Sequence, residues 1–254
     1  MRISSPEVRL LVGWMALEAR RGWAVTEEVR TTAGLRLHYV GVPAGKAGRR
    51  PSRRALERGA RRLRRAGCRR VLAAPGFPAW ALLRAAGLRP VDPGPLCAAL
   101  AAPLALAWLA REGLAPERAT VALAGGRVDR ALFETAAALA PRVRALAVEV
   151  PREGEALLRL LEREWGLPAL EGARGGADLT LRFPGAPAGT GAALDLSGTE
   201  AGLDGLVPAG PEELPGTLER LPLLALLWEE GRLKKEEIRI QPGKSLDRTG
   251  QTNL

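Results

Sequence analysis

The C-terminal half of the sequence alternates short apolar segments with longer segments of helical spacing, and this alternation restricts the fold more than any other feature. Apolar segments with the length of strands lie at 120–124, 143–150, 178–183 and 192–196. Between the first three, 127–140 and 153–165 carry apolar residues every three or four positions, as helices do. Strands that alternate with helices form a parallel sheet with right-handed crossovers. The sequence therefore predicts an α/β fold in this half.

The N-terminal half predicts a smaller, mixed α/β domain. Helical spacing of apolar residues predicts a helix over 6–21. Period-two alternation on either side of Ala33-Gly34 predicts a hairpin with strands at 23–32 and 35–42. Further along the chain we expect a loop at 43–51, a helix from Ser52 to Ala66, a strand at 71–74, a helix at 78–86 and a strand at 89–91.

Four parts follow from these patterns. Residues 1–93 form the small domain, and an apolar helix within 94–116 connects it to the next part. Residues 117–240 form the larger α/β domain, which ends with a buried helix at 211–229. The polar segment 241–254 is expected to be a flexible tail.

The formal net charge of +10 is concentrated in one segment. Residues 49–70 contain 11 arginines and one acid, Glu57, whereas the remaining chain has 27 basic and 27 acidic residues. Ser52 can cap a helix here, with small apolar residues on one side and arginines on the other. Arg54, Arg58, Arg61 and Arg65 are therefore candidates for binding an anionic partner such as a nucleic acid or an acidic protein.

Two observations argue against a specialised role for these arginines. Arginine outnumbers lysine 34 to 4 throughout the chain, so an arginine-rich helix face is also expected from composition alone. No aromatic residue lies between Tyr39 and Phe77, so the stacking surfaces of single-strand-binding proteins are missing. The alternative is a helix face that is merely solvated.

The rare residues exclude several classes of site. The sequence has one histidine, His38, and two cysteines, Cys68 and Cys97, with no CxxC or HExxH motif, so no metal site is expected. His38 lies in a strand-like alternation, which favours a partly buried structural histidine over a catalytic base. The two cysteines are interpreted as small buried apolar residues in a reducing compartment.

No membrane segment or signal peptide is expected. The longest uncharged stretch, 93–110, has alanine as its commonest residue and contains three prolines, whereas a membrane span needs about 20 strongly apolar residues. Glu7 and Arg9 precede any apolar run, so the order of a signal peptide is missing. The expected location is the cytoplasm.

The turn after the first strand of the C-terminal half reads Gly125-Gly126-Arg127-Val128-Asp129-Arg130. It resembles the first strand–turn–helix of Rossmann domains that bind NAD or NADP. Segments 177–184 and 193–197 resemble later strands of shikimate dehydrogenase and glutamyl-tRNA reductase, in which a small domain also precedes the nucleotide domain. The resemblance covers 120–197. It implies a Rossmann-like sheet and NAD or NADP as the cofactor.

The turn departs from the Rossmann fingerprint. Its three glycine positions fall on Ala124, Gly126 and Asp129, so only the middle glycine is present. At ~5 Å and an effective dielectric constant of about 20, the charge of Asp129 would repel a phosphate charge by about 3 kcal/mol. Arg127 and Arg130 can offset this repulsion, and a helix N-terminus attracts anions.

The resemblance also implies a ribose site. Glu149 ends the second strand, 23 residues after Gly126, where a Rossmann acid holds the adenosine ribose. Arg152 lies where an arginine can select a 2′-phosphate. The candidate cofactor-binding residues are Gly125, Gly126, Arg127, Arg130 and Glu149.

No catalytic pair can be assigned. A relative of shikimate dehydrogenase would supply a lysine and an aspartate from its first domain, but Lys46 is the only lysine of the first half. Three hypotheses therefore stand beside one another. The protein binds a nucleotide or dinucleotide as a non-catalytic relative of NAD(P)-dependent dehydrogenases, it binds nucleic acid or an acidic partner through the 49–70 segment, or it is a scaffold or regulatory protein with neither activity.

Overall fold

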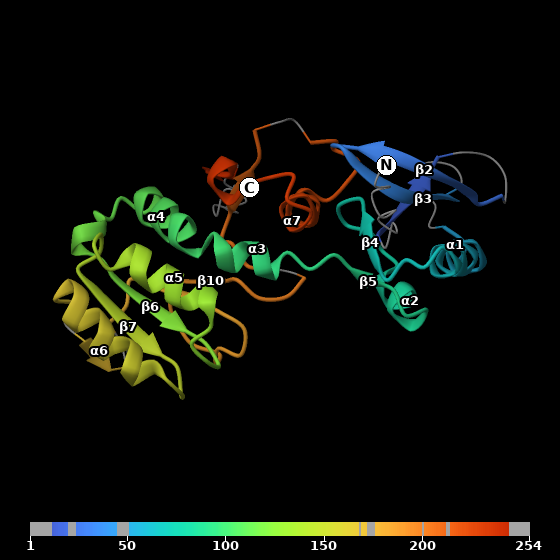
Figure 1. The fold of residues 1–254 in the computed structure, drawn as a ribbon. Helices are drawn as coiled ribbons and strands as arrows, with labels where there is room; N and C mark the ends of the chain where they lie inside the picture. The colour runs from blue at the N-terminus through green and yellow to red at the C-terminus, as the bar shows by residue number, and fades with distance from the viewer. Residues whose placement is uncertain are drawn as a thin grey trace, which may run out of the picture. The chain divides into compact units, whose positions relative to one another are not determined.

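The computed structural model describes residues 12–19, 24–44, 51–167, 169–171, 176–199, 201–211 and 214–243. The chain divides into two compact units. Unit 1 comprises Met1–Val91 and Glu212–Arg232, and unit 2 comprises Asp92–Pro211 and Leu233–Leu254. Each unit contains a five-stranded sheet (Figure 1).

The sheet of unit 1 has the strand order β2-β3-β1-β4-β5. Its strands are β1 (Val12–Glu18), β2 (Thr26–Thr32), β3 (Leu35–Pro43), β4 (Arg70–Ala73) and β5 (Arg89–Pro90). Only β2 runs antiparallel to its neighbour, β3. The predicted hairpin is confirmed, because β2 and β3 are joined by Ala33 and Gly34, whose φ angles of 46° and 74° suit a two-residue hairpin turn.

The helix predicted over 6–21 is wrong where the structure describes it. Val12–Glu18 is a strand, β1, paired in parallel with β3 on one side and β4 on the other. A central strand is buried on both faces, so its residues form an almost continuous apolar run that helical spacing also fits. Residues 6–11 and 20–21 lie outside the described part of the chain.

The arginine-rich helix, α1 (Arg53–Arg65), forms as the sequence predicts. The Ser52 hydroxyl accepts a hydrogen bond from the Ala55 N–H (3.2 Å), and the helix ends at Ala66, before Gly67 with a φ of 84°. Its small residues bring the helix close to the sheet. A Cβ atom on Gly59 would lie 3.0 Å from Val42 and 3.2 Å from Met15.

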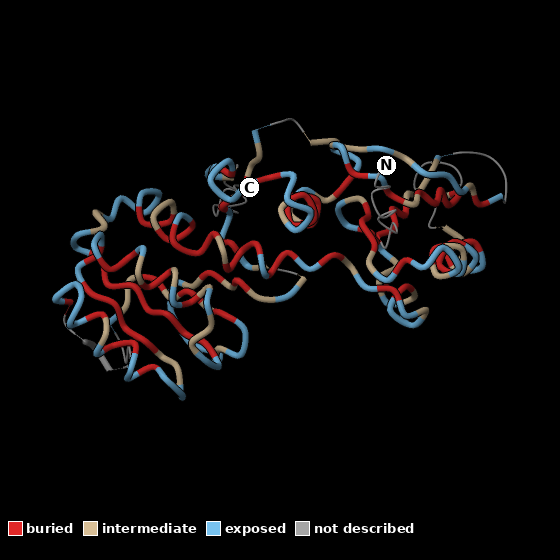
Figure 2. The backbone as a smooth tube through the Cα atoms, in the orientation of Figure 1, coloured by how far each residue is buried: buried red, intermediate tan, exposed pale blue. Residues whose placement is uncertain are grey.

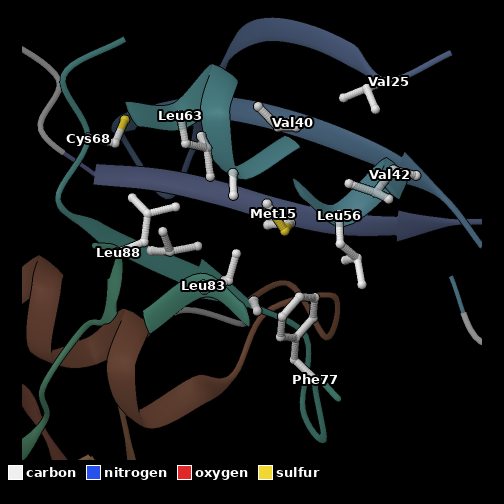
Figure 3. Packing of buried hydrophobic residues seen from close by; sticks show 14 residues of the cluster. Met15, Val25, Val40, Val42, Leu56, Leu63, Cys68, Phe77, Leu83 and Leu88 are labelled. Carbon is white, nitrogen blue, oxygen red and sulfur yellow. The ribbon is translucent and has the colours of Figure 1, made fainter. Parts of the chain in front are cut away.

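The core of unit 1 lies between α1, α2 (Trp80–Ala85) and one face of the sheet. Figure 3 shows Leu56 and Leu63 of α1 facing Met15, Val40 and Val42 of the strands. Leu63, Met15, Val40 and Val42 are fully buried. The amphipathic pattern of α1 therefore does two things: it buries one side of the helix in this core and leaves the arginines outside.

The last helix, α7 (Arg220–Glu229), groups with unit 1 and not with the 117–240 domain in which we expected it. The Glu219 N–H donates to the carbonyl oxygen of Ala73 at the end of β4 (2.9 Å), and Arg70 of β4 pairs with Glu229. The helix also begins at Arg220, nine residues later than the predicted 211–229. Apolar content identified a buried helix, but not the sheet against which it packs.

Unit 2 contains the following elements: α3 (Gly94–Ala99), α4 (Ala101–Arg111), η1 (Pro116–Arg118), β6 (Thr120–Ala124), α5 (Arg130–Leu139), β7 (Ala145–Glu149), α6 (Gly154–Trp165), β8 (Ala169–Glu171), β9 (Leu179–Arg182), β10 (Ala193–Asp195), β11 (Leu206–Ala209), η2 (Lys235–Glu237) and β12 (Arg239–Pro242). The sheet has the order β10-β9-β6-β7-β8, and all its pairs are parallel. Numbered from β6, this is the order 3-2-1-4-5 in reverse, as in Rossmann sheets. The predicted α/β fold with a Rossmann-like parallel sheet is confirmed.

Two details of unit 2 differ from the expectation. The single helix expected within 94–116 is two helices, α3 and α4, which meet at Leu100. Pro103 lies in the first turn of α4, where a proline is tolerated because the N–H it lacks has no partner within a helix. Residues 241–242 belong to strand β12, which pairs with β11, and so are not part of a tail. Residues 244–254 lie outside the described residues.

The two faces of the central strands of unit 2 differ in side-chain size. Large aliphatic residues alternate with small ones: Val121 and Leu123 of β6 are in register with Leu146 and Val148 of β7, and with Leu179 and Leu181 of β9. Figure 2 shows β6 buried along its whole length. No helix among the described residues has the length and apolar character needed to cross a membrane.

The packing of α1 on the sheet predicts a large difference between its two sides. Leu63→Ala should lower the free energy of unfolding by about 2–5 kcal/mol, because Leu63 is fully buried. Arg61→Ala, two positions away on the exposed side, should change it by less than about 0.5 kcal/mol. Urea denaturation of both variants measures the difference, and equal effects would contradict this orientation of α1.

Candidate functional site

The turn after β6 lies at the point where the strand order reverses. From β6 the chain continues to β7 on one side, and later to β9 on the other. Ala124, the last residue of β6, is in register with Glu149 of β7 and with Arg182 of β9. In open parallel sheets, ligands bind outside the carboxyl ends of the strands at this point. The edge therefore presents a turn with two glycines, flanked by an acid on one strand and an arginine on the other.

The glycine turn is held by the loops on both sides of it. The Gly125 N–H donates to the Glu149 carbonyl oxygen (3.2 Å), and the Gly126 N–H donates to the Pro184 carbonyl oxygen (3.0 Å). In Rossmann domains, backbone amides of this region face the diphosphate. Because the two glycine amides here donate to protein carbonyls, a phosphate at this edge would have to be held by other groups.

The contact between this turn and the loop after β9 requires glycine on one side. A Cβ atom on Gly185 would lie 3.1 Å from the Gly126 Cα, and Gly185 has a φ of 79°. A Cβ atom on Gly126 would lie 3.4 Å from the Gly185 Cα, which is an ordinary contact. The loop of β9 therefore needs its glycine for this close approach more than the turn of β6 needs Gly126.

Asp129 has a structural role at the start of α5. Its Oδ1 atom accepts a hydrogen bond from the Leu132 N–H (2.9 Å), as an N-cap residue does. The carboxylate thus lies where the positive end of the helix attracts an anion. In this protein a side chain already supplies the negative charge that a bound phosphate would otherwise bring.

The two arginines of the turn have different surroundings. Arg130 donates to Glu134 one helical turn further along (2.7 Å), and this hydrogen bond lowers the pKa of the Glu134 carboxyl group. Glu134 also lies 3.7 Å from Lys235. Arg127 is exposed in the turn itself. Of the two residues expected to offset the charge of Asp129, Arg127 is the better placed to meet a phosphate, because Arg130 is engaged with Glu134.

Glu149 ends β7, as the ribose site requires, and its side chain is half-buried. Arg152 is exposed in the loop that follows. The structure thus places Gly125, Gly126, Arg127 and Glu149 at one edge of the sheet, and Arg130 on the helix behind the turn. Sequence reasoning missed Arg182 and Gly185 as site residues. Their place in the sequence could have identified them. Arg182 ends an apolar strand, and Gly185 follows Phe183-Pro184 in the next loop.

The arginines of the second hypothesis lie in the other unit. Arg54, Arg58, Arg61 and Arg65 are all exposed on α1 of unit 1. The candidate nucleotide site and the candidate nucleic-acid surface are therefore separate features on separate sheets.

The rare residues have structural surroundings. His38 lies on β3, with its Nε2 2.7 Å from Glu27 Oε1, so it is the partly buried strand histidine that we expected. Burial raises the pKa of the Cys68 thiol to about 11 and that of the Cys97 thiol to about 12. Both thiols are buried, free of disulfide bonds and protonated at neutral pH, which makes them poor nucleophiles. No cluster of three or more metal-ligating side chains occurs within the described ranges.

Unit 2 also has a cavity of about 300 Å³. It is lined mainly by apolar residues of α3, α4, α5 and the segment from Lys235 to Ile238, including Leu100, Pro103 and Ala138. Glu134 and Lys235 also contribute to its lining. None of the candidate cofactor-binding residues lines this cavity.

Similarity to known proteins is weak. No family model and no curated protein matches the sequence. Among solved structures, a shikimate dehydrogenase in complex with NADP+ is 12% identical with a TM-score of 0.25, and the match covers 67% of this chain and 65% of that one. A shikimate 5-dehydrogenase-like protein is 11% identical with a TM-score of 0.23, covering 69% and 66%. The chain thus spans just under two thirds of each. At such TM-scores the likeness carries no argument about fold or function.

The turn-to-turn contact predicts unequal effects of two alanine substitutions. Gly185→Ala should lower the free energy of unfolding by about 1–2 kcal/mol, because alanine is strained at a positive φ and its Cβ would press on the backbone of Gly126. Gly126→Ala should cost less than about 0.5 kcal/mol. Chemical denaturation of the two variants measures the change in the free energy of unfolding for each. A costlier Gly126→Ala would show that the contact is not the one described.

A strained residue lies in the loop after β7. Glu153 has a φ of 65° and precedes α6 without a side-chain cap. Glu153→Gly should raise the free energy of unfolding by about 0.5–1 kcal/mol, because glycine adopts this conformation without strain. Glu155→Gly, within α6, should instead lower it by up to about 1 kcal/mol. The melting temperature should therefore rise for Glu153→Gly and fall for Glu155→Gly.

Proposed function

We propose that unit 2 binds an adenosine nucleotide of the NAD or NADP class at the carboxyl edge of its parallel sheet. The observation that supports this proposal is the position of the Gly125-Gly126 turn, which follows the first strand of a 3-2-1-4-5 sheet at the point where the strand order reverses. Glu149, in register with the last residue of β6, supplies an acid beside the turn. The proposed function is binding, and no residue is assigned a catalytic role.

The adenosine half of the nucleotide belongs at the end of β7. A carboxylate at this position accepts hydrogen bonds from the ribose hydroxyl groups. The same carboxylate repels a 2′-phosphate, so Glu149 favours NAD over NADP. Arg152, two residues beyond Val150 in the exposed loop, is the group that would oppose this preference.

The phosphates must be held differently from those in a typical Rossmann domain. The amides of Gly125 and Gly126 donate to carbonyl oxygens, and the Asp129 carboxylate occupies the N-terminus of α5. The exposed guanidinium of Arg127 is then the principal phosphate contact, because arginine can form two parallel hydrogen bonds to a phosphate. We therefore expect weaker binding than a turn with free amides would give.

Thermal unfolding in the presence of nucleotides tests the proposal directly. The purified protein is heated with NAD, NADP, their reduced forms, ATP or S-adenosylmethionine. A nucleotide at 100 times its dissociation constant should add about 2.7 kcal/mol, which raises the melting temperature by several degrees. NAD should give the largest shift. If none of these nucleotides shifts the melting temperature at millimolar concentration, the proposal fails.

Substitutions in the turn test where the nucleotide lies. Gly126→Asp should abolish the shift while leaving the fold intact, because it adds a second charge at an exposed position with room for a side chain. Arg127→Gln should weaken binding about tenfold, the loss of roughly one charged hydrogen bond. Arg142→Gln is the matched control, since Arg142 is equally exposed but lies before β7, at the opposite edge of the sheet. Its affinity should equal that of the unmodified protein.

Asp129→Asn gives the sharpest test. Asparagine caps a helix about as well as aspartate, so α5 should keep its start. Removing the negative charge should strengthen nucleotide binding by about tenfold to a hundredfold if the phosphate lies within about 5 Å of this carboxylate. Calorimetric titration of NAD into both proteins measures the change. An unchanged affinity would place the phosphate elsewhere.

A further inference from the structure

The exposed side of α1 carries four arginines in one line. Arg54, Arg58, Arg61 and Arg65, here called the arginine face, are spaced by four, three and four residues and are all exposed. Residues at these spacings lie above one another on a helix, so the line is about 16 Å long. The opposite side of the helix is buried in the core of unit 1 (Figure 3).

Few acids pair with the arginines of α1 in the part of the chain that the structure describes. Glu57 is the only acid on α1, and it pairs with Arg53 (2.9 Å), outside the arginine face. Arg62 donates to the Val25 carbonyl oxygen (2.8 Å) and lies 3.7 Å from Glu27. Arg54, Arg61 and Arg65 form no ion pair within the described ranges. Like charges at these spacings destabilise a helix, so the arrangement costs stability.

We propose that the arginine face binds the phosphate backbone of double-stranded nucleic acid without reading its sequence. Guanidinium groups match phosphates through paired hydrogen bonds. One strand of a duplex presents a phosphate about every 3.4 Å along its axis, so a 16 Å line of arginines spans roughly five phosphates. Arginine can also bind guanine edges, but α1 has no asparagine or glutamine to read adenine, so its polar side chains offer no means of distinguishing a varied base sequence.

The residues in and around α1 favour a duplex over a single strand or a membrane surface as the anionic partner. Single strands are bound by aromatic side chains that stack on bases, and no aromatic residue lies between Tyr39 and Phe77. Helices that bind a membrane surface insert an apolar side, but Leu56, Ala60 and Leu63 are buried against the sheet. A regular duplex fits an unbroken line of equal charges that is rigidly attached to a sheet. This surface is independent of the nucleotide site proposed for unit 2.

The experiment measures binding of the full chain to a labelled 16-base-pair duplex, as DNA and as RNA, by fluorescence anisotropy over a range of salt. Four phosphate contacts predict that log K falls with log salt at a slope of about −3 to −4, so affinity should drop about a hundredfold between 50 and 200 mM salt. The variant R54Q/R58Q/R61Q/R65Q should lose binding, and its remaining salt slope should approach zero.

A second variant keeps the test specific to α1. R118Q/R142Q/R159Q/R163Q removes the same charge from exposed arginines of unit 2 and should bind the duplex as the unmodified protein does. Circular dichroism confirms that both variants are folded; glutamine is nearly as good a helix former as arginine. Three results would overturn the proposal: a flat salt dependence, equal loss in both variants, or tighter binding to polyglutamate or to phosphatidylserine vesicles than to the duplex.

Discussion

The hydrogen-bond ladders that place β6 between β7 and β9 determine where every candidate residue of unit 2 lies. Because both neighbours run parallel to β6, all three strands end at one edge, and the register brings Glu149 and Arg182 to either side of Ala124. The same arrangement brings the loop after β9 against the turn after β6, where Gly126 meets Gly185. Large aliphatic side chains on one face of these strands stabilise the arrangement by burial.

This edge has the strand order of a Rossmann sheet, but the chemistry of its turn differs. In a Rossmann domain, free amides and the helix N-terminus together attract the diphosphate. Here the amides of Gly125 and Gly126 stabilise the turn itself, and Asp129 caps α5. In both cases a group of the protein makes the interaction that a ligand would otherwise make with the glycine amides or with the N-terminus of α5. The turn is therefore stable without a ligand, and any nucleotide must bind through side chains, with Arg127 and Glu149 as the nearest candidates.

In unit 1 the main constraint is the charge of α1. Helix α1 must pack closely on its sheet while carrying many like charges, and its small residues make this feasible: Gly59 and Ala60 let the helix approach Val42 and Met15, and the arginines project away from the core. Burial of Leu56 and Leu63 offsets the repulsion among the charges on the exposed side. The result is a rigid cationic line in a unit whose sheet is separate from the candidate nucleotide site.

The sequence by itself determined the alternation of strands and helices in unit 2, the hairpin at Ala33-Gly34, and both the cap and the exposed side of α1. These features follow from local physics: hydrophobic periodicity, turn conformation and capping are encoded within a few residues. The same local signals were ambiguous for Val12–Glu18, because a strand buried on both faces has no alternation. Only the tertiary structure decided that α7 packs with unit 1, that Arg182 and Gly185 adjoin the glycine turn, and that the amides of Gly125 and Gly126 are already bonded. Each of these depends on contacts between residues far apart in the chain, which sequence periodicity does not record.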